Sequence, residues 1–195
     1  MQNIKQRVDS ILKEYDLDFT IETAPMAGKL ANGTEAITPY YGLFNSKTGA
    51  CINTVKAGYG VSQNATLVEA VLRGAEKYTN DLHVTKAGAL HEGRQVYIQM
   101  QINGIGRVGK DEIKRYITII DSNDGSTSLS VGIGDLTMSC RNQFYYFYEK
   151  GQAKFRHTAT IEEKIKEIPK LIDLALAESL LQIQRYNRFL STPVS

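Results

Sequence analysis

The sequence is poor in cysteine, contains no long apolar run and carries almost no net charge. Its two cysteines, Cys51 and Cys140, show no CxxC spacing, as is typical of a protein that works in a reducing compartment. The N-terminus lacks a basic region followed by an apolar run, so we expect no signal peptide. A cytoplasmic protein is therefore predicted.

Length and charge narrow the class of protein further. The longest apolar runs are far too short to cross a bilayer, so no contact with a membrane is expected. A formal charge of +2 argues against a general polyanion binder, although local basic clusters could still act where the average is neutral. With 195 residues, the chain is long enough to bury a core as one globular domain, residues 1–195.

Three stretches have the spacing of amphipathic helices. Gln2 to Tyr15 and Ala65 to Tyr78 each place their apolar residues on one face. A third, long helix is predicted from Thr160 to about Leu190, opened by a capping box between Thr160 and Glu163. Pro169 lies inside this helix and is expected to kink it.

The segment before the second helix predicts a hairpin and an arm. Tyr40 to Phe44 and Ala50 to Val55 flank a pentapeptide with the residues that hairpin turns need. Residues 23–39 are rich in glycine, alanine, threonine, asparagine and proline, so a flexible loop or arm is expected there.

The middle of the chain has the composition of β-strands separated by glycine-bearing turns. Connections this short force antiparallel neighbours, because parallel strands need long crossovers. The predicted fold class is α+β: an antiparallel β-sheet with helices packed on one face and a long C-terminal helix. The predicted strands are His83 to Leu90, Arg94 to Ile102, Ile113 to Asp121 and Thr127 to Met138.

Gly104, Gly106 and Gly109 spell the GxGxxG pattern of dinucleotide-binding proteins. That motif needs a helix immediately afterwards, whose N-terminal amides bind the pyrophosphate, whereas here another strand is predicted to follow. We therefore interpret the segment as a glycine-rich hairpin tip that carries Arg107 and Lys110. No cofactor is expected.

Two aspartates belong to the turn sequence around residues 122–126, Ser-Asn-Asp-Gly-Ser: Asp121 directly precedes it and Asp124 lies within it. Asp121 and Asp124 could bind a divalent cation or share acid/base work. Asn-Asp-Gly is also what a tight turn requires, and this interpretation is preferred. Asn123, Asp124 and Asn142 are accordingly assigned to turn and strand-end scaffolding.

The histidines offer a second, weaker chemical hypothesis. His83, His91 and His157 have no metal-ligand spacing, so no metal site is predicted from them. Cys140 and His157 could form a nucleophile pair, because such dyads are assembled by the fold rather than by spacing. A buried structural cysteine is the commoner case.

Residues 141–157 combine aromatic and basic side chains. Five aromatic residues run from Phe144 to Tyr148, and the stretch has four Lys or Arg residues against Glu149 alone. Aromatic faces stack on nucleobases and cations neutralise phosphates, which favours single-stranded nucleic acid as the ligand. The alternative is that some of these rings belong to the core.

Five segments, in one order along the chain, carry a resemblance to a known family. They are AGYGVSQN at 57–64, AGALHEGRQV at 87–96, Tyr116 with SNDGS at 122–126, CRN at 140–142 and RHT at 156–158. Together they resemble the phage/plasmid-like proteins called domain of unknown function 932, over roughly residues 57–160. Family members usually have His where this chain has Asn123, which makes a catalytic role at that turn less credible.

The resemblance implies a protein of a phage or plasmid in a bacterial host, similar in its pattern to phage single-strand annealing proteins. The leading hypothesis is a cofactor-free homo-oligomer that binds single-stranded nucleic acid, DNA rather than RNA, and assists annealing or recombination. Tyr145 and Tyr148 are the predicted stacking residues. The predicted phosphate contacts are Arg94, Arg107, Lys110, Arg141, Lys154 and Arg156.

Two alternatives belong to other classes of protein. The first is a metal-dependent nuclease or hydrolase that uses Asp121, Asp124 and His157. The second is a structural or host-interaction protein without nucleic-acid binding, in which the aromatic stretch and the last helix form a protein interface.

Overall fold

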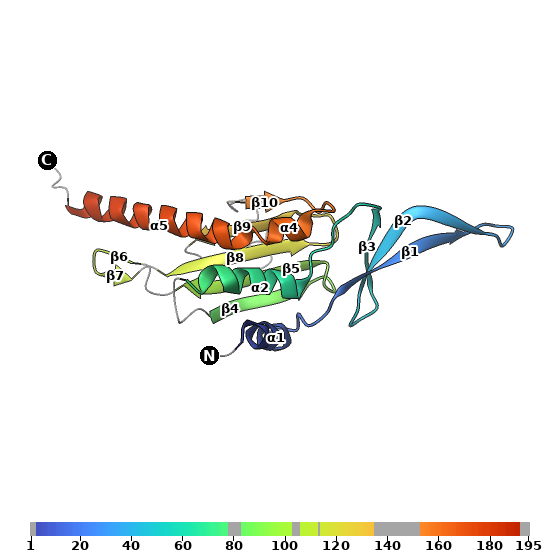
Figure 1. Cartoon of the computed structure of the whole chain (residues 1–195), viewed down its shortest axis with the longest axis horizontal. Coiled ribbons are helices and arrows are strands. Elements are labelled where there is room, and N and C mark those ends of the chain that lie inside the picture. Colours follow the sequence, from blue (N-terminus) through green and yellow to red (C-terminus); the bar gives the residue numbers. More distant parts are fainter. Residues whose placement is uncertain (1–2, 78–82, 103–105, 113, 135–152, 192–195) are drawn as a thin grey trace.

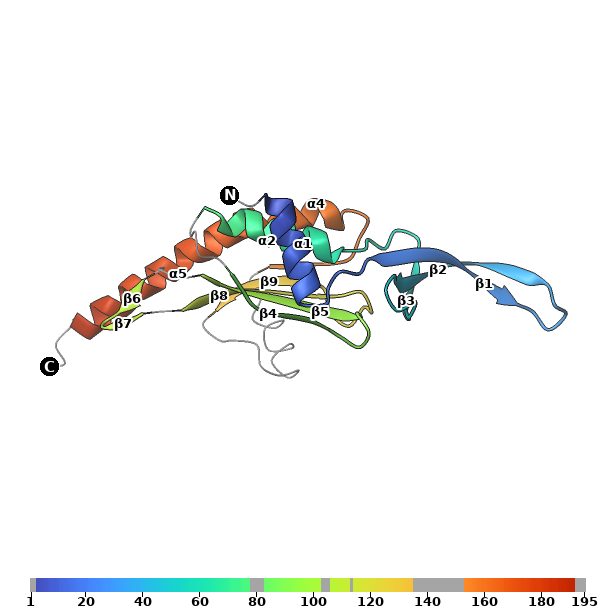
Figure 2. The ribbon, with the colours of Figure 1, turned by 90° about the horizontal axis from the view of Figure 1, so that it is seen from below.

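The fold is α+β, as predicted, with an antiparallel sheet and helices on one of its faces (Figures 1 and 2). The computed structural model describes residues 3–77, 83–102, 106–112, 114–134 and 153–191. Among these, the main sheet has the strand order β10 (Ala153–Phe155), β9 (Leu129–Gly134), β8 (Arg115–Ser122), β5 (Gln95–Ile102) and β4 (His83–Leu90). All its pairings are antiparallel, as short connections require.

In the part of the chain that the structure describes, the helices form a single layer over the sheet (Figure 2). They are α1 (Ile4–Glu14), α2 (Asn64–Ala75), α4 (Ile161–Ile165) and α5 (Ile168–Ser191), and α2 contacts both α1 and α5. Gly74 allows the close approach of α2 to α5, because a Cβ there would lie 2.7 Å from Ile172 Cδ1. The core lies between this layer and the alternate residues of β5, β8 and β9 that include Ile98, Ile119 and Val131.

The long C-terminal helix is interrupted near its start. α4 and α5 are separate because a continuous helix would force the ring of Pro169 against the carbonyl of Ile165. The predicted kink is thus a break. The predicted capping box is wrong, since the Thr160 side chain makes no capping hydrogen bond and its hydroxyl lies 3.1 Å from that of Thr158.

A second sheet projects from one end of the main sheet (Figure 1). It consists of β1 (Ile21–Lys29), β2 (Glu35–Asn45) and β3 (Cys51–Lys56), and we call it the arm. Residues 23–39, expected to form a flexible loop or arm, lie in this arm, where most of them pair as strands in β1 and β2. Pro25 lies at an irregularity in that pairing, where the missing N–H is tolerated.

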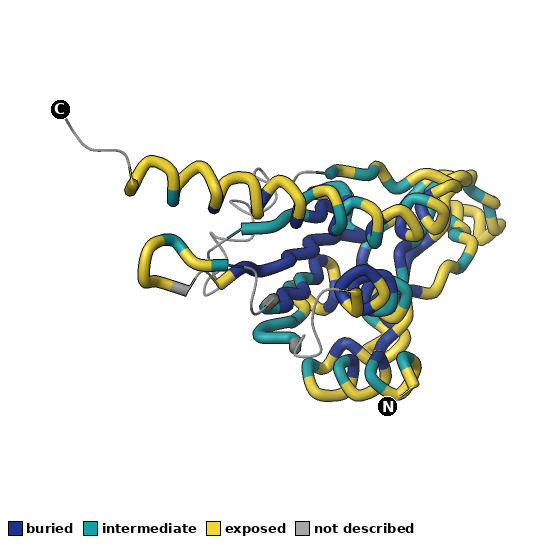
Figure 3. Tube along the Cα trace, turned by 60° about the vertical axis from the view of Figure 1, so that its left-hand side comes forward, coloured by how far each residue is buried: buried dark blue, intermediate teal, exposed yellow. Residues whose placement is uncertain are grey.

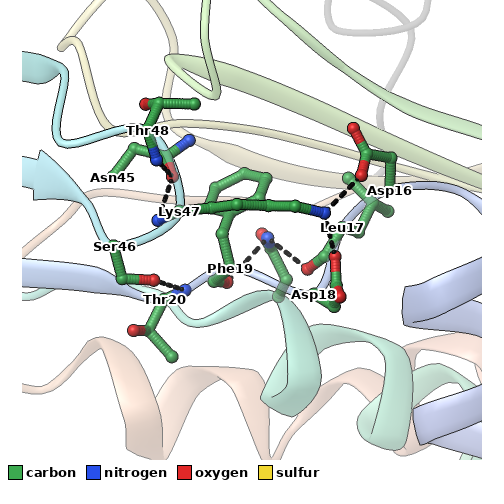
Figure 4. A network of polar contacts seen from close by, with 10 residues as sticks. Asp16, Leu17, Asp18, Phe19, Thr20, Asn45, Ser46, Lys47 and Thr48 are labelled. Atoms are coloured by element: carbon green, nitrogen blue, oxygen red, sulfur yellow. Dashed lines mark hydrogen bonds and ion pairs between the residues drawn. The ribbon is translucent and has the colours of Figure 1, made fainter.

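Polar side chains fasten the arm to the rest of the chain (Figure 4). Lys47 forms ion pairs with Asp16 and, at 2.7 Å, with Asp18, and the hydrogen bond from Lys47 lowers the pKa of Asp18. The buried Asn64 side chain donates to the carbonyls of Leu17 and Phe19. These contacts fix the entry to β1 beside the start of α2.

The opposite end of the main sheet carries a small hairpin, β6 (Arg107–Val108) with β7 (Asp111–Glu112), as predicted for the glycine-rich tip. Asn187 of α5 holds it, donating to Arg107 O at 2.7 Å and accepting from Gly109 N at 2.8 Å. The outer side of α5 is exposed along its length (Figure 3). Among the described residues, no helix combines the length and apolar character needed to cross a membrane.

Candidate functional site

A buried aspartate marks the end of the main sheet from which the arm projects. Asp121 pairs with Val96 in the register of β8 and β5, so its side chain lies on the core face of the sheet. Only 2% of this side chain is exposed. It accepts a short hydrogen bond from the hydroxyl of Ser62, just before α2, and contacts Nε2 of His157 at 2.9 Å.

His157 uses both of its ring nitrogens. Nε2 faces the Asp121 carboxylate, and Nδ1 lies 3.0 Å from the carbonyl oxygen of Gly60. Both partners are acceptors, so both nitrogens must donate and the ring is an imidazolium. Burial alone would lower the pKa of His157, but the hydrogen bond and charge of Asp121, together with the Gly60 carbonyl, raise it above the ordinary value.

The Asp121–His157 pair joins three segments that are far apart in the sequence. The ring of Tyr59 stacks on that of His157, with centroids 5.1 Å apart and planes within 3°. The approach of the two segments needs a glycine at position 60, because a Cβ there would lie 1.9 Å from the carbonyl oxygen of Thr158. The loop before α2, the end of β8 and the segment after β10 are thus held as one unit.

This arrangement differs from that of a hydrolase. In a catalytic triad the histidine lies between the nucleophile and the carboxylate, whereas here Asp121 lies between Ser62 and His157. Ser62 is fully buried, and His157 has no free nitrogen to act as a base. Cys140, which was considered as a nucleophile paired with His157, lies outside the described residues.

The alternative of a cation site at Asp121 and Asp124 has no supporting geometry in the described part of the chain. Asp124 Oδ1 accepts from the amide of Ser126 at 2.8 Å, which is the contact of a tight turn. Within that part, no cluster of three or more His, Cys, Asp or Glu side chains is placed to hold a metal ion. Asn123 fits its scaffolding assignment, since its amide donates to Arg94 O and its carbonyl accepts from Asn53.

An open hollow of ≈330 Å³ lies beside the Asp121–His157 pair, and we call it the arm-end pocket. The hydroxyl of Thr127 is buried and makes no hydrogen bond with any residue that the structure describes. Arg156 is exposed, and its guanidinium is likewise unpaired within that set. The pocket therefore offers a cation and an aromatic ring to a ligand. It is lined by Tyr59, residues 125–128, Arg156 and His157.

More cations and one more ring lie at the same end. Arg94 is exposed, and its carbonyl accepts from Asn123 in the turn that borders the pocket. Lys154, also exposed, pairs with Ser130 in the register of β10 and β9. On the arm, the ammonium of Lys56 lies 5.9 Å from the centre of the Tyr40 ring.

The predicted interface residues do not all lie together. Arg94, Lys154 and Arg156 are at the arm end, whereas Arg107 and Lys110 are exposed on the β6–β7 hairpin at the other end (Figure 1). Arg141, Tyr145 and Tyr148 lie outside the described residues, as does Asn142.

The sequence interpretation missed Tyr59 and Ser62 as members of the site. Both lie in the segment 57–64 that contributed to the family resemblance, and the segments 122–126 and 156–158 border the same pocket. The segment 87–96 reaches it through Gln95, which donates to the Ser126 hydroxyl at 2.7 Å. Most of the resemblance therefore converges on one place.

Comparison with known proteins identifies the family. The chain belongs to the family described as Domain of unknown function (DUF932), whose model matches residues 51–195. That range contains the arm-end pocket but begins after β1 and β2. No curated protein and no solved structure matches the chain.

Proposed function

We propose that this member of the DUF932 family binds single-stranded nucleic acid at the arm end of its main sheet. The observation that carries the proposal is the arm-end pocket, in which Tyr59 and Arg156 offer stacking and charge within one hollow. DNA is the proposed ligand rather than RNA. The protein acts without a cofactor, as an oligomer.

The phosphates contact the exposed cations around the pocket. Arg156 lines the pocket. Arg94 directly precedes Gln95, which donates to Ser126 in the pocket lining. Lys56 lies in the same turn as Tyr59, whose amide donates to the carbonyl oxygen of Lys56 at 3.3 Å. Each phosphate neutralised by such a residue releases counterions, which makes binding weaken as salt rises. The small net charge of the whole chain is compatible with this, because a few local cations are enough to contact the phosphates of a short nucleic-acid segment.

The bases of a single strand, unlike those of a duplex, are free to stack on aromatic rings. Tyr59 is held flat against the imidazolium of His157, so its orientation is fixed before a ligand arrives. Tyr40, on the arm, is a second exposed ring beside a cation. Stacking contributes about 1–3 kcal/mol per base and tolerates any sequence.

The setting that we propose is strand annealing or recombination during phage or plasmid replication, in the cytoplasm of a bacterial host. Its support is the resemblance to phage/plasmid-like proteins and the similarity in pattern to phage annealing proteins, which is an analogy of fold. Annealing requires two strands to be held with their bases accessible, and an open pocket at the end of a sheet is compatible with that requirement.

The test is fluorescence anisotropy of a labelled single-stranded oligonucleotide titrated with the protein at several salt concentrations, with a duplex of equal length alongside. We expect preferential binding of the single strand, with an affinity that falls steeply with salt. Arg156→Glu should weaken binding about tenfold and reduce the salt slope by about one phosphate.

Lys5→Glu is the matched control, because it changes the charge by the same amount on α1 and places a carboxylate in the first turn, where helices favour it. It should leave binding unchanged. If the wild-type protein binds neither ligand at low salt, or if both variants weaken binding equally, the arm-end pocket is not the binding site.

A further inference from the structure

The outer face of α5 carries a stripe of large apolar side chains that are more than half exposed. Leu174, Leu181 and Phe189 are exposed by 60%, 54% and 75%. At 3.6 residues per turn, they lie on the side opposite to the buried Ile172, Leu176 and Ile183. Figure 3 shows this side of α5 exposed along its length.

Two charged residues stand in the same stripe. Glu178 and Arg185 lie between Leu174 and Phe189, both exposed, and neither forms an ion pair with any residue that the structure describes. Their spacing of seven residues places them on one face, two turns apart, too far along the axis to meet each other. Each is available to a partner outside the chain.

The stripe is complementary to itself when a second copy runs in the opposite direction. If two α5 helices cross near Leu181, Glu178 of each faces Arg185 of the other, and Leu174 of each faces Phe189 of the other. Two ion pairs and two apolar contacts then form around a central contact between leucines. This is the reciprocal pattern of an interface with twofold symmetry.

The surface beside Leu174 also fits this arrangement. A hollow of ≈170 Å³ lies between α5 and β9, with Leu174 and Glu178 on its rim and mainly apolar residues, among them Val131 and Ile133, in its wall. The ring that an antiparallel second copy brings to this place is Phe189. Insertion of an aromatic anchor into a neighbouring hollow is how stable interfaces commonly gain affinity.

We infer that the chain forms a symmetric dimer through antiparallel packing of α5 on α5, with reciprocal Glu178–Arg185 pairs. The inference deepens the oligomeric part of the proposed function and names its interface. Because its test contains no nucleic acid, it can fail while strand binding stands, and the reverse also holds.

The test is sedimentation velocity of the full chain over a range of concentrations. Wild-type protein should dimerise, and Glu178→Arg and Arg185→Glu should each raise the dimer dissociation constant at least about tenfold, because each change replaces two ion pairs by two like-charge contacts. Glu163→Arg, the same charge change on an exposed residue of α4, should have no effect.

The decisive step is to mix the two variants. The E178R chain then presents an arginine at both positions of the stripe, and the R185E chain presents a glutamate at both, so every facing pair is again of opposite charge. The mixture should form a heterodimer about as stable as the wild-type dimer, and the double variant E178R/R185E should form an equally stable homodimer. A monomeric wild-type protein, single variants that dimerise normally, or a mixture that stays monomeric would each overturn the inference.

Discussion

Both ends of the main sheet carry charged residues, but these residues are buried and hydrogen-bonded at one end and exposed at the other. At the arm end, Asp121 and His157 are buried against each other, with 2% and 4% of their side chains exposed, and Ser62 and Gly60 complete their hydrogen bonds. At the other end, Arg107 and Lys110 stand on a hairpin of two-residue strands. Asn187 connects that hairpin to α5.

The difference shows how a structured site, with buried and hydrogen-bonded charges, differs from exposed charged side chains. Burying an ion pair is costly, so it persists only where good geometry and further hydrogen bonds repay the desolvation. The Asp121–His157 pair has both and holds Tyr59 in place beside the pocket. Arg107 and Lys110 have positive charge but no such buried, hydrogen-bonded pair beside them, so we expect them to contribute less to nucleic-acid binding.

The largest expected effect comes from removing the buried cation. His157→Gln leaves the Asp121 carboxylate buried without a counter-charge, which should lower the free energy of unfolding by about 3–5 kcal/mol. Urea denaturation at pH 7 measures it. His91→Asn is the control, because His91 is exposed in a turn with φ of 52°, which asparagine tolerates. Equal stability of wild type and His157→Gln would mean that the pair contributes nothing.

Gly60→Ala should have the next largest effect. The added Cβ would meet the carbonyl oxygen of Thr158 and Ile161 Cγ2, so the loop before α2 must move away from His157. We expect a loss of about 1–3 kcal/mol in unfolding free energy, as for other overpacked sites. Gly28→Ala in the arm serves as the control, because its Cβ would come no closer than 4.0 Å to a neighbouring atom. A fully stable Gly60→Ala protein would contradict the close approach of these segments.

Two substitutions of Tyr59 test whether its ring binds the nucleic acid or only stabilises the fold. Tyr59→Leu removes the stacking ring and should weaken single-strand binding about tenfold, within the range for one stacked base. Tyr59→Phe keeps the ring and removes a hydroxyl that is buried without a hydrogen bond to the described residues, so stability should be unchanged or slightly higher. Anisotropy and urea denaturation of both variants decide it. If Tyr59→Leu binds normally, the ring is only structural.

The pH dependence of stability should report the charge of His157. Because its pKa is raised in the folded protein, its contribution is complete below the ordinary value of 6.5 and is lost as pH rises through the raised pKa. In Asp121→Asn, burial is the main remaining influence on the pKa of His157, and it lowers that pKa. The contribution of His157 to stability is then lost as pH falls rather than as pH rises. Unfolding free energies of both proteins between pH 5 and pH 9, about the range in which a histidine titrates, should therefore diverge on the acid side. Parallel curves would show that Asp121 does not set the charge of His157.

The sequence predicts the elements of this fold better than the contacts between them. α1 and α2 follow from periodicity, since one face of each is apolar, and the main strands follow from their composition and from the glycine-bearing turns between them. The strand pairing of residues 23–39 was not predicted, because their composition suits a loop or arm and the pairing depends on a register that composition does not contain. Asp121 and His157 were grouped only in the hypothesis of a metal-dependent enzyme. Their buried contact could not be predicted, since 36 residues separate them and only the order β10–β9–β8 brings them together.

The smallest expected effect belongs to the other end of the sheet. Arg107 and Lys110 were predicted as phosphate contacts, yet they lie away from the arm-end pocket (Figure 1). A single-stranded oligonucleotide bound at the arm end reaches Arg107 and Lys110 only if it is long enough. The double reversal R107E/K110E should therefore weaken binding of an oligonucleotide of about 40 nucleotides by about threefold. It should not weaken binding of an oligonucleotide of about 8 nucleotides. Arg156→Glu should weaken both. Equal effects of the two variants on the short oligonucleotide would mean that the two ends of the sheet form one interface. That result would contradict the functional difference between the two ends.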